Sequence, residues 1–137
     1  MAEKYFSVNT NRTYRPNSYK EMLQEKKAAA YYDRKEEIIK INKGDTVFLY
    51  HNRVGVIAFG KAIDSYKIKD FAGDKNEEYF IPLKFNWQIN PDIEPEKAIK
   101  VSEIKGRLNH LPPFFRWAVR PLHEKIAIKI IEISHMK

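Results

Sequence analysis

The stretch that most constrains the fold is Lys43–Ala62, which reads KGDTVFLYHNRVGVIAFGKA. Two apolar runs, Thr46–His51 and Val54–Ala62, are rich in Val, Ile, Phe and Tyr, and only Asn52 and Arg53 separate them. This pattern predicts a β-hairpin. Neither run alternates cleanly between apolar and polar residues. Both faces of the ribbon must therefore be covered, as at the centre of a barrel or under a helix.

Three glycines mark places where the backbone of this hairpin has to bend. Gly44 belongs to the turn that opens the first strand, where it is free to take a positive φ. Gly55 and Gly60 lie inside the second run, which predicts a bulge, a sharp bend or a close approach of another backbone. The hairpin is thus predicted to be the core on which the other segments pack.

Length and composition exclude several classes of protein. A chain of 137 residues is long enough for one domain, 1–137, with a substantial core. The absence of cysteine excludes disulfides and thiolate metal sites. No apolar run is long enough to span a membrane, and the opening residues MAEKYFSV lack an export pattern. We therefore expect a soluble, cytoplasmic protein without a membrane partner.

The net charge of +7 is unevenly distributed. Residues 97–137 carry nine Lys and Arg against three Asp and Glu, whereas residues 41–96 carry seven against nine. A concentrated basic surface, with an isoelectric point of about 9.5, favours a polyanionic partner, nucleic acid first. The alternative is a solvated surface that keeps the protein soluble.

The rest of the chain predicts strands and helices around the hairpin. A first strand is expected at Tyr5–Val8, and a capping box of Ser18 and Glu21 opens a helix that continues to about Tyr32. The later elements are expected to be a strand at Lys61–Lys69, a loop at Asp70–Glu78, a long strand at Tyr79–Ile89, short strands at Ala98–Val101 and Phe114–Val119, and a helix from Pro121. The fold class is therefore α+β: a small, strongly curved β-barrel of about five or six strands with flanking helices.

Residue types that support catalysis are missing or scattered. The glycines form no phosphate-binding cluster, no serine lies in a nucleophile-elbow context, and the four histidines lack metal-ligand spacing. The acidic group at residues 70–78 could be a divalent-metal site, but it is more simply a solvated loop. We expect no catalytic residue, metal or cofactor.

Aromatic residues interleaved with cations are the most distinctive remaining feature. They occur at Tyr31 and Tyr32 beside Arg34, at Phe85 and Trp87 after Lys84, and at Phe114–Trp117 before Arg120. An exposed ring beside a cation suits base stacking with phosphate neutralisation, worth roughly 1–3 kcal/mol per base. The competing interpretation is that Trp87 is a core residue, because it falls on the same strand face as Phe85, Leu83 and Ile81.

Five segments, in this order, resemble the PUA-like group that includes the EVE and YTH domains. They are YFSVNTNR (5–12), KAAAYY (27–32), GDTVFLYHNRVGVIAFGKA (44–62), PLKFNWQI (82–89) and FFRWAVRPLHEKI (114–126). Domains of this group are small β-barrels that read modified nucleotides. The resemblance therefore implies a PUA-like barrel that binds DNA or RNA carrying a modified, methylated base. In that group the base is extruded and held in a cage of aromatic side chains.

The resemblance also implies roles for individual residues. The cage walls would be Tyr31 or Tyr32, Trp87 and Trp117; the base-edge readers Asn9 and Asn11; and the phosphate-binding residues Arg12, Arg15, Arg116, Arg120 and Lys125. Because no second domain accompanies the barrel, any nuclease or motor that acts on the base would be a separate chain.

Two other functions remain open. The related ASCH domains include enzymes, and a hydrolase acting on RNA or a nucleoside would use Glu103, Lys105 and Arg107. A protein-interaction module would instead hold a protein segment in an aromatic groove. Salt dependence separates that module from a nucleic-acid-binding protein, whose affinity falls steeply with salt.

Overall fold

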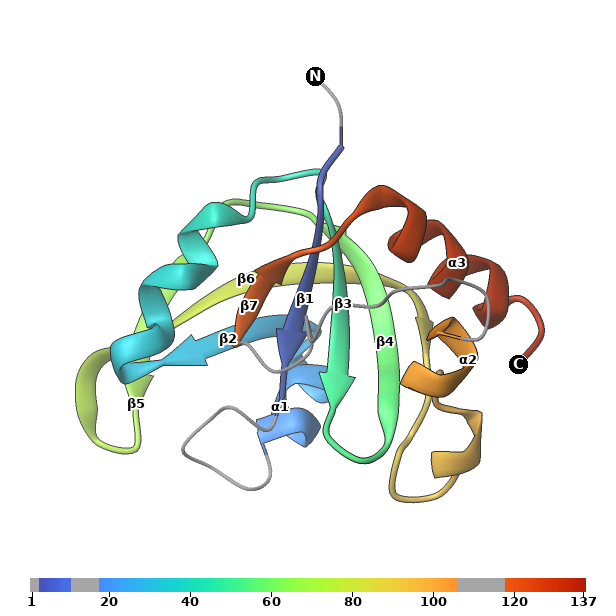
Figure 1. The fold of residues 1–137 in the computed structure, drawn as a ribbon. Helices are drawn as coiled ribbons and strands as arrows, with labels where there is room; N and C mark the ends of the chain where they lie inside the picture. The colour runs from blue at the N-terminus through green and yellow to red at the C-terminus, as the bar shows by residue number, and fades with distance from the viewer. Residues whose placement is uncertain (1–2, 11–17, 106–117) are drawn as a thin grey trace.

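The computed structural model describes residues 3–10, 18–105 and 118–137. Within these residues, seven strands form one curled sheet flanked by helices (Figure 1). The elements are β1 (Tyr5–Asn9), α1 (Ser18–Glu25), β2 (Lys27–Tyr31), η1 (Tyr32–Lys40), β3 (Thr46–His51), β4 (Gly55–Ala62), β5 (Lys67–Phe71), β6 (Asp74–Gln88), η2 (Pro95–Lys97), α2 (Val101–Lys105), β7 (Val119–Pro121) and α3 (Glu124–Ser134).

The β3–β4 hairpin lies at the centre of the sheet, as the sequence predicts. The strand order is β2-β6-β4-β3-β1-β7, with β5 paired to β6 outside this path. β1 runs parallel to β3, whereas β6 runs antiparallel to β4. Every residue of β4 except Lys61 is buried. The predicted α+β class and the curved sheet with flanking helices are confirmed.

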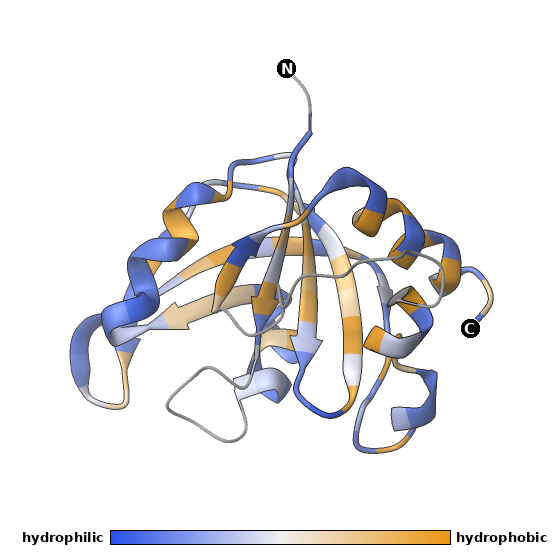
Figure 2. Cartoon of the chain, viewed as in Figure 1, coloured by the Kyte–Doolittle hydropathy of each residue, from blue (hydrophilic) through white to orange (hydrophobic). Residues whose placement is uncertain are grey.

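Two apolar clusters cover the two faces of the hairpin. The inner core joins Val47 and Leu49 to residues of α1, β2 and η1, for example Met22. The outer core joins Phe48 and Phe59 to residues of α2 and α3. Figure 1 shows α2 and α3 together at one side of the sheet and η1 at the other, and Figure 2 shows apolar residues recurring along α3. The absence of alternation in the hairpin is thereby explained.

Two glycines of β4 allow close backbone approaches, as predicted. A Cβ at Gly60 would lie 2.2 Å from the carbonyl oxygen of Lys84, beside the register shift between Phe59 and Gly60. A Cβ at Gly55, whose φ is +127°, would lie 2.5 Å from the carbonyl oxygen of Ile99. The pairing of β4 with β6 therefore depends on the missing side chain at Gly60.

The predicted helix from Ser18 to Tyr32 is wrong in its second half. α1 ends at Glu25, Lys26 takes a positive φ of 55°, and Lys27–Tyr31 is a strand paired with β6. All five residues of β2 are buried. Three consecutive alanines have a high helix propensity and carry no strand periodicity, so the sequence pattern favoured a helix over the buried strand.

The predicted loop at residues 70–78 is also wrong. β5 and β6 form a hairpin that turns at Ala72 and Gly73, which both have positive φ. The strand expected at Ala98–Val101 is only an isolated bridge from Ile99 to Val56, and α2 follows it. The terminal helix is confirmed as α3. Most of the strand expected at Phe114–Val119 lies outside the described residues.

Among the residues that the structure describes, no helix is long and apolar enough to cross a membrane.

We predict that Gly60→Ala destabilises the protein more than Gly73→Ala. At Gly60 the added Cβ meets backbone, so β6 must move, at a cost of about 2–3 kcal/mol. At Gly73 nothing lies within 4 Å, and the cost is the strain of a positive φ, about 1–2 kcal/mol. Urea denaturation of both variants measures the difference. Equal losses of stability in the two variants would show that the backbones of β4 and β6 do not approach closely at Gly60.

Candidate nucleic-acid interface

Tyr31 and Tyr32 are held at one end of the sheet. Tyr31 is fully buried, with its ring centroid 4.1 Å from that of Phe71. Tyr32 contacts Phe71 edge-on at 5.4 Å, and its hydroxyl donates to Asp74 at 2.6 Å. Neither ring stands beside Trp87. Tyr31 pairs with Glu78, nine residues before Trp87 on β6, which is about 30 Å along the strand.

Trp87 lies on the outer face because β6 is bulged. Phe59 pairs with Trp87 and the next residue, Gly60, pairs with Phe85, so Asn86 has no partner on β4. The bulge reverses the alternation and places Trp87 against Phe59, with ring centroids 5.9 Å apart and planes 25° apart. The predicted cage is therefore corrected: Trp87 is separated from Tyr31 and Tyr32, and Trp117 lies outside the described residues.

Trp87 lines a pocket between α3 and the outer face of the sheet, here named the α3 pocket. Its volume is about 320 Å³. The lining residues are Glu3, Tyr5, Thr46, Phe59, Lys61, Asn86, Trp87, Ile131, Ser134 and His135. Three aromatic rings from three different strands thus border one cavity. Sequence reasoning missed Tyr5 and Phe59 as partners of Trp87, because only the bulge brings Trp87 to their side.

The charged side chains of the α3 pocket neutralise each other. The Glu3 carboxylate lies 3.4 Å from the Lys61 ammonium and also accepts a short hydrogen bond from the Thr46 hydroxyl. Burial, followed by the charge of Glu3, raises the pKa of Tyr5, so its hydroxyl stays protonated. The pocket therefore offers apolar ring faces and neutral polar groups rather than net charge.

Asn9, a predicted base-edge reader, is engaged at the end of β1. Asn9 is 1% exposed, and its side-chain amide donates to Asn52 at 3.0 Å. The neighbouring Thr10 hydroxyl lies 2.7 Å from Nδ1 of His51. Burial lowers the pKa of His51, against the opposing charge of Asp92. This network fixes β1 to the tip of the β3–β4 hairpin. Asn11 lies outside the described residues.

Two of the predicted phosphate-binding residues are described, and both are exposed. Arg120 lies on β7, opposite Ser7 of β1, and Lys125 lies in the first turn of α3. Lys125 and the pocket residue Ile131 are six residues apart on α3, about 9 Å along its axis. Arg12, Arg15 and Arg116 lie outside the described residues.

Of the residues predicted for a hydrolase, only Glu103 has a described side chain, and it is used structurally. Glu103 accepts from Lys137 at 2.7 Å and from the backbone N–H of Lys100 at 2.8 Å, so both of its oxygens are engaged. Arg107 and the side chain of Lys105 lie outside the described residues. Within the described part of the chain, no group of three or more His, Asp and Glu residues is arranged to hold a metal.

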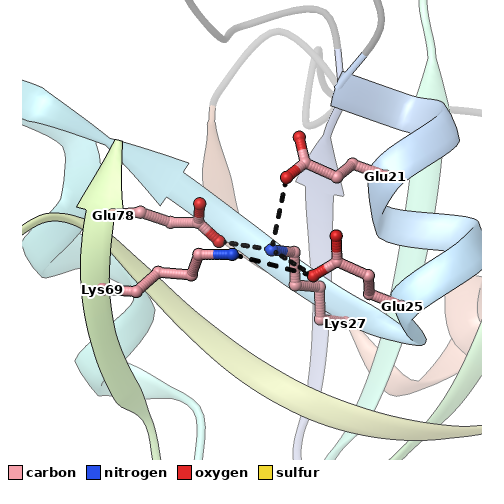
Figure 3. Close-up of polar contacts among 5 residues, drawn as sticks. All are labelled: Glu21, Glu25, Lys27, Lys69 and Glu78. Atoms are coloured by element: carbon pink, nitrogen blue, oxygen red, sulfur yellow. Dashed lines mark hydrogen bonds and ion pairs between the residues drawn. The ribbon is translucent and has the colours of Figure 1, made fainter. Parts of the chain in front are cut away.

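A buried charge cluster joins α1 to the sheet, and sequence reasoning missed it (Figure 3). Lys27 is only 2% exposed, and its ammonium lies 2.6 Å from Glu78, 3.0 Å from Glu25 and 3.9 Å from Glu21. Lys69 approaches Glu25 at 3.9 Å from β5. Lys27 fell within the helix predicted from Ser18 to about Tyr32, and no sequence signal placed it inside.

The carboxylates keep Lys27 charged. Burial alone would lower the pKa of Lys27, but Glu78 and Glu25 more than offset this and raise it. The hydrogen bond from Lys27 in turn lowers the pKa of Glu25. A fully paired ammonium inside a strand pair has a structural role: it ties α1, β2 and β6 together.

Comparisons with known proteins identify the fold. No protein-family model matches the sequence, and no curated protein matches it. Among solved structures, a hypothetical protein from Leishmania major matches with a TM-score of 0.64 and 13% identity, over 98% of this chain and 96% of that one. The human THYN1 protein, in complex with DNA containing 5-methylcytosine, matches with a TM-score of 0.59 and 10% identity, over 98% and 99%. The MmI1 YTH domain matches with a TM-score of 0.54 and 10% identity, over 98% and 97%.

The chain has the PUA-like fold. The predicted resemblance to EVE and YTH domains is thereby confirmed at the level of fold. Within this fold, the α3 pocket lies on the outer face of the curled sheet, and the Lys27 cluster lies where α1 meets β2 and β6.

We predict that Lys27→Met costs about 3–5 kcal/mol of stability, because it leaves Glu78 charged and buried without its partner. The double variant Lys27→Met, Glu78→Leu should recover most of this loss, since no buried charge remains. Urea denaturation of wild type, both single variants and the double variant measures the coupling. If the double variant loses as much stability as the two single variants together, the two side chains do not act as a pair.

Proposed function

We propose that this chain is a non-enzymatic module that binds nucleic acid and recognises a modified base in DNA or RNA. The observation that carries the proposal is the fold shared, over nearly all of both chains, with a protein solved in complex with DNA containing 5-methylcytosine. The net charge of +7 supports a polyanionic partner. A nuclease or motor subunit that acts on the recognised base is proposed as a further partner.

The α3 pocket is the proposed site for the base. A flipped base needs ring or apolar faces around it and hydrogen-bonding groups at its rim. Trp87, Phe59 and Tyr5 supply rings, and Asn86 supplies an amide that makes no hydrogen bond to another described residue. The volume of about 320 Å³ is at the lower end of the range for small-molecule pockets, ~300–1,000 Å³.

Discrimination of a methyl group follows from the same rings. A methyl group buried against an aromatic face gains about 0.8 kcal/mol over water. Phe59 is fixed before binding, because it is 5% exposed and packs on Phe48 at 5.2 Å. A rigid pocket needs little ordering when the base enters, so the small gain from a methyl group is retained as affinity.

Phosphate contacts are proposed for the cations near α3. Arg120 and Lys125 are exposed, and they keep the roles implied by the resemblance. Arg12, Arg15, Arg116, Asn11 and Trp117 keep theirs as part of the proposal, although they lie outside the described residues. Asn86 takes over base-edge reading from Asn9, whose amide is held by Asn52.

We predict that wild-type protein binds an oligonucleotide with one modified base more tightly than its unmodified counterpart. Fluorescence anisotropy with 5-methylcytosine and N6-methyladenine, each in DNA and RNA, measures the ratio. Trp87→Ala should lower affinity for the modified strand by about 1–3 kcal/mol, whereas Trp87→Phe should lose less. The matched control is Tyr66→Ala, an aromatic residue 37% exposed outside the pocket. A folded Trp87→Ala variant that keeps the full preference would contradict the site.

We also predict a steep salt dependence of this binding. For single strands, log K falls with log salt by about 0.7 per phosphate contact, so replacing Arg120 and Lys125 with Gln should lower the slope by about 1.4. A slope near zero would favour the protein-interaction module. Cleavage of RNA during incubation with Mg²⁺ would favour the hydrolase instead.

A further inference from the structure

A second pocket lies between α1 and the segment that follows β6, and we name it the α1 pocket. Its volume is about 570 Å³. Leu23, Ile89 and Pro91 give it apolar walls, and the amide side chains of Gln24, Gln88 and Asn90 border it. None of these residues belongs to the α3 pocket.

The walls of the α1 pocket are fixed by hydrogen bonds. The Tyr19 hydroxyl donates to Asp92 at 2.6 Å, which raises the pKa of Tyr19 to about 12 and keeps the donor protonated. The backbone N–H of Asp92 donates to the Asn90 side chain at 3.0 Å. The ring of Tyr19 packs on His51 at 4.3 Å. α1 and the segment after β6 therefore keep a constant spacing.

Two amides on different elements line the pocket and are available for a ligand. Gln24 comes from α1 and Gln88 from β6, both are exposed, and neither makes a hydrogen bond to another described residue. A primary amide presents one acceptor and two donors on a planar group. This pattern matches the adjacent donor and acceptor of adenine, with which Asn and Gln form bidentate pairs.

The pocket carries little net charge. Of its two carboxylates, Asp92 lies 3.7 Å from Lys20, and Glu94 lies 3.0 Å from Lys97. Lys97 donates a hydrogen bond to Glu94, and this bond is the main reason why the pKa of Glu94 is lowered. With each carboxylate paired to a lysine, the pocket suits an uncharged ring better than a phosphate.

The two pockets are neighbours along β6. Asn86 and Trp87 line the α3 pocket, whereas Gln88 and Ile89 line the α1 pocket, about 7 Å farther along the chain. From Lys84 to Gln88 the edge of β6 away from β4 has no strand partner among the described residues. Lys84 is exposed at the start of this edge and offers a cation for the phosphate between two nucleotides.

We propose that the α1 pocket binds the base next to the modified one, with adenine preferred, so that the protein reads a two-nucleotide context. This inference rests on the proposed function. A nucleic-acid strand whose modified base lies in the α3 pocket brings the neighbouring base to the edge of β6. Gln88 and Gln24 read the base edge, and Leu23, Ile89 and Pro91 contact its faces.

The test measures anisotropy with oligonucleotides in which each neighbour of the modified base is A, C, G or T in turn. Wild type should prefer adenine on one side by at least about fivefold, the lower bound for a bidentate amide–adenine pair. Gln88→Ala should reduce this preference to about twofold or less, while the ratio of modified to unmodified strands stays constant. Gln88→Glu should shift the preference toward cytosine, whose amino group donates to a carboxylate.

The outcomes separate this inference from the proposed function. Trp87→Ala should abolish the preference for the modified base and keep the adenine preference among the strands still bound. A wild-type protein without neighbour preference, or a folded Gln88→Ala variant that keeps it, would overturn the inference while leaving the modified-base proposal intact. The NMR chemical shifts of the Gln88 side-chain amide provide a second test. If they change on addition of a capped dipeptide but not of any oligonucleotide, the inference is overturned in favour of a protein partner.

Discussion

The structure depends on a central hairpin that is apolar on both faces. Phe48 and Leu49 are adjacent on β3 and both are fully buried, one in the outer core and the other in the inner core. A ribbon of this kind cannot be stable until both faces are covered, since each buried side chain gains roughly 1.5–3 kcal/mol only when water is excluded. α1, β2 and η1 cover one face, and α2 and α3 cover the other. The α3 pocket exists because α3 covers this outer face incompletely.

The bulge in β6 decides which residues meet in that pocket. A regular strand would place Trp87 beside Phe85 on the inner side, as the sequence periodicity indicates. The extra residue, Asn86, lies opposite the position where Gly60 lets the Lys84 backbone come close. Trp87 then reaches Phe59 on the outer face. The glycine inside β4 is visible in the sequence, but the strand partner that carries the bulge is not, so the face of Trp87 could not be predicted.

Sequence patterns predicted those parts of the fold in which apolar spacing has a single interpretation. α3 is of this kind, because its Ile residues recur at helical spacing. The hairpin was predicted from two strand-length runs of Val, Ile and Phe separated by a two-residue turn. The segment Lys27–Tyr31 has no single interpretation, because Ala28, Ala29 and Ala30 carry no periodic signal. Of the candidate site, Trp87 was found from its aromatic and basic neighbours. Tyr5 and Phe59 were not, because they are distant in sequence and joined only by the sheet.

The Lys27 cluster supplies what the three alanines of β2 lack. Alanine side chains are alike, so a slip of β2 by two residues along β6 would keep their packing nearly unchanged. The same slip would move Lys27 by about 7 Å relative to Glu78 and break a 2.6 Å ion pair that is almost completely buried. Leaving that charge unpaired in the core costs several kcal/mol, so only one register remains favourable. A buried ion pair adds little net stability over apolar residues, but here it distinguishes between registers that Ala28, Ala29 and Ala30 cannot tell apart.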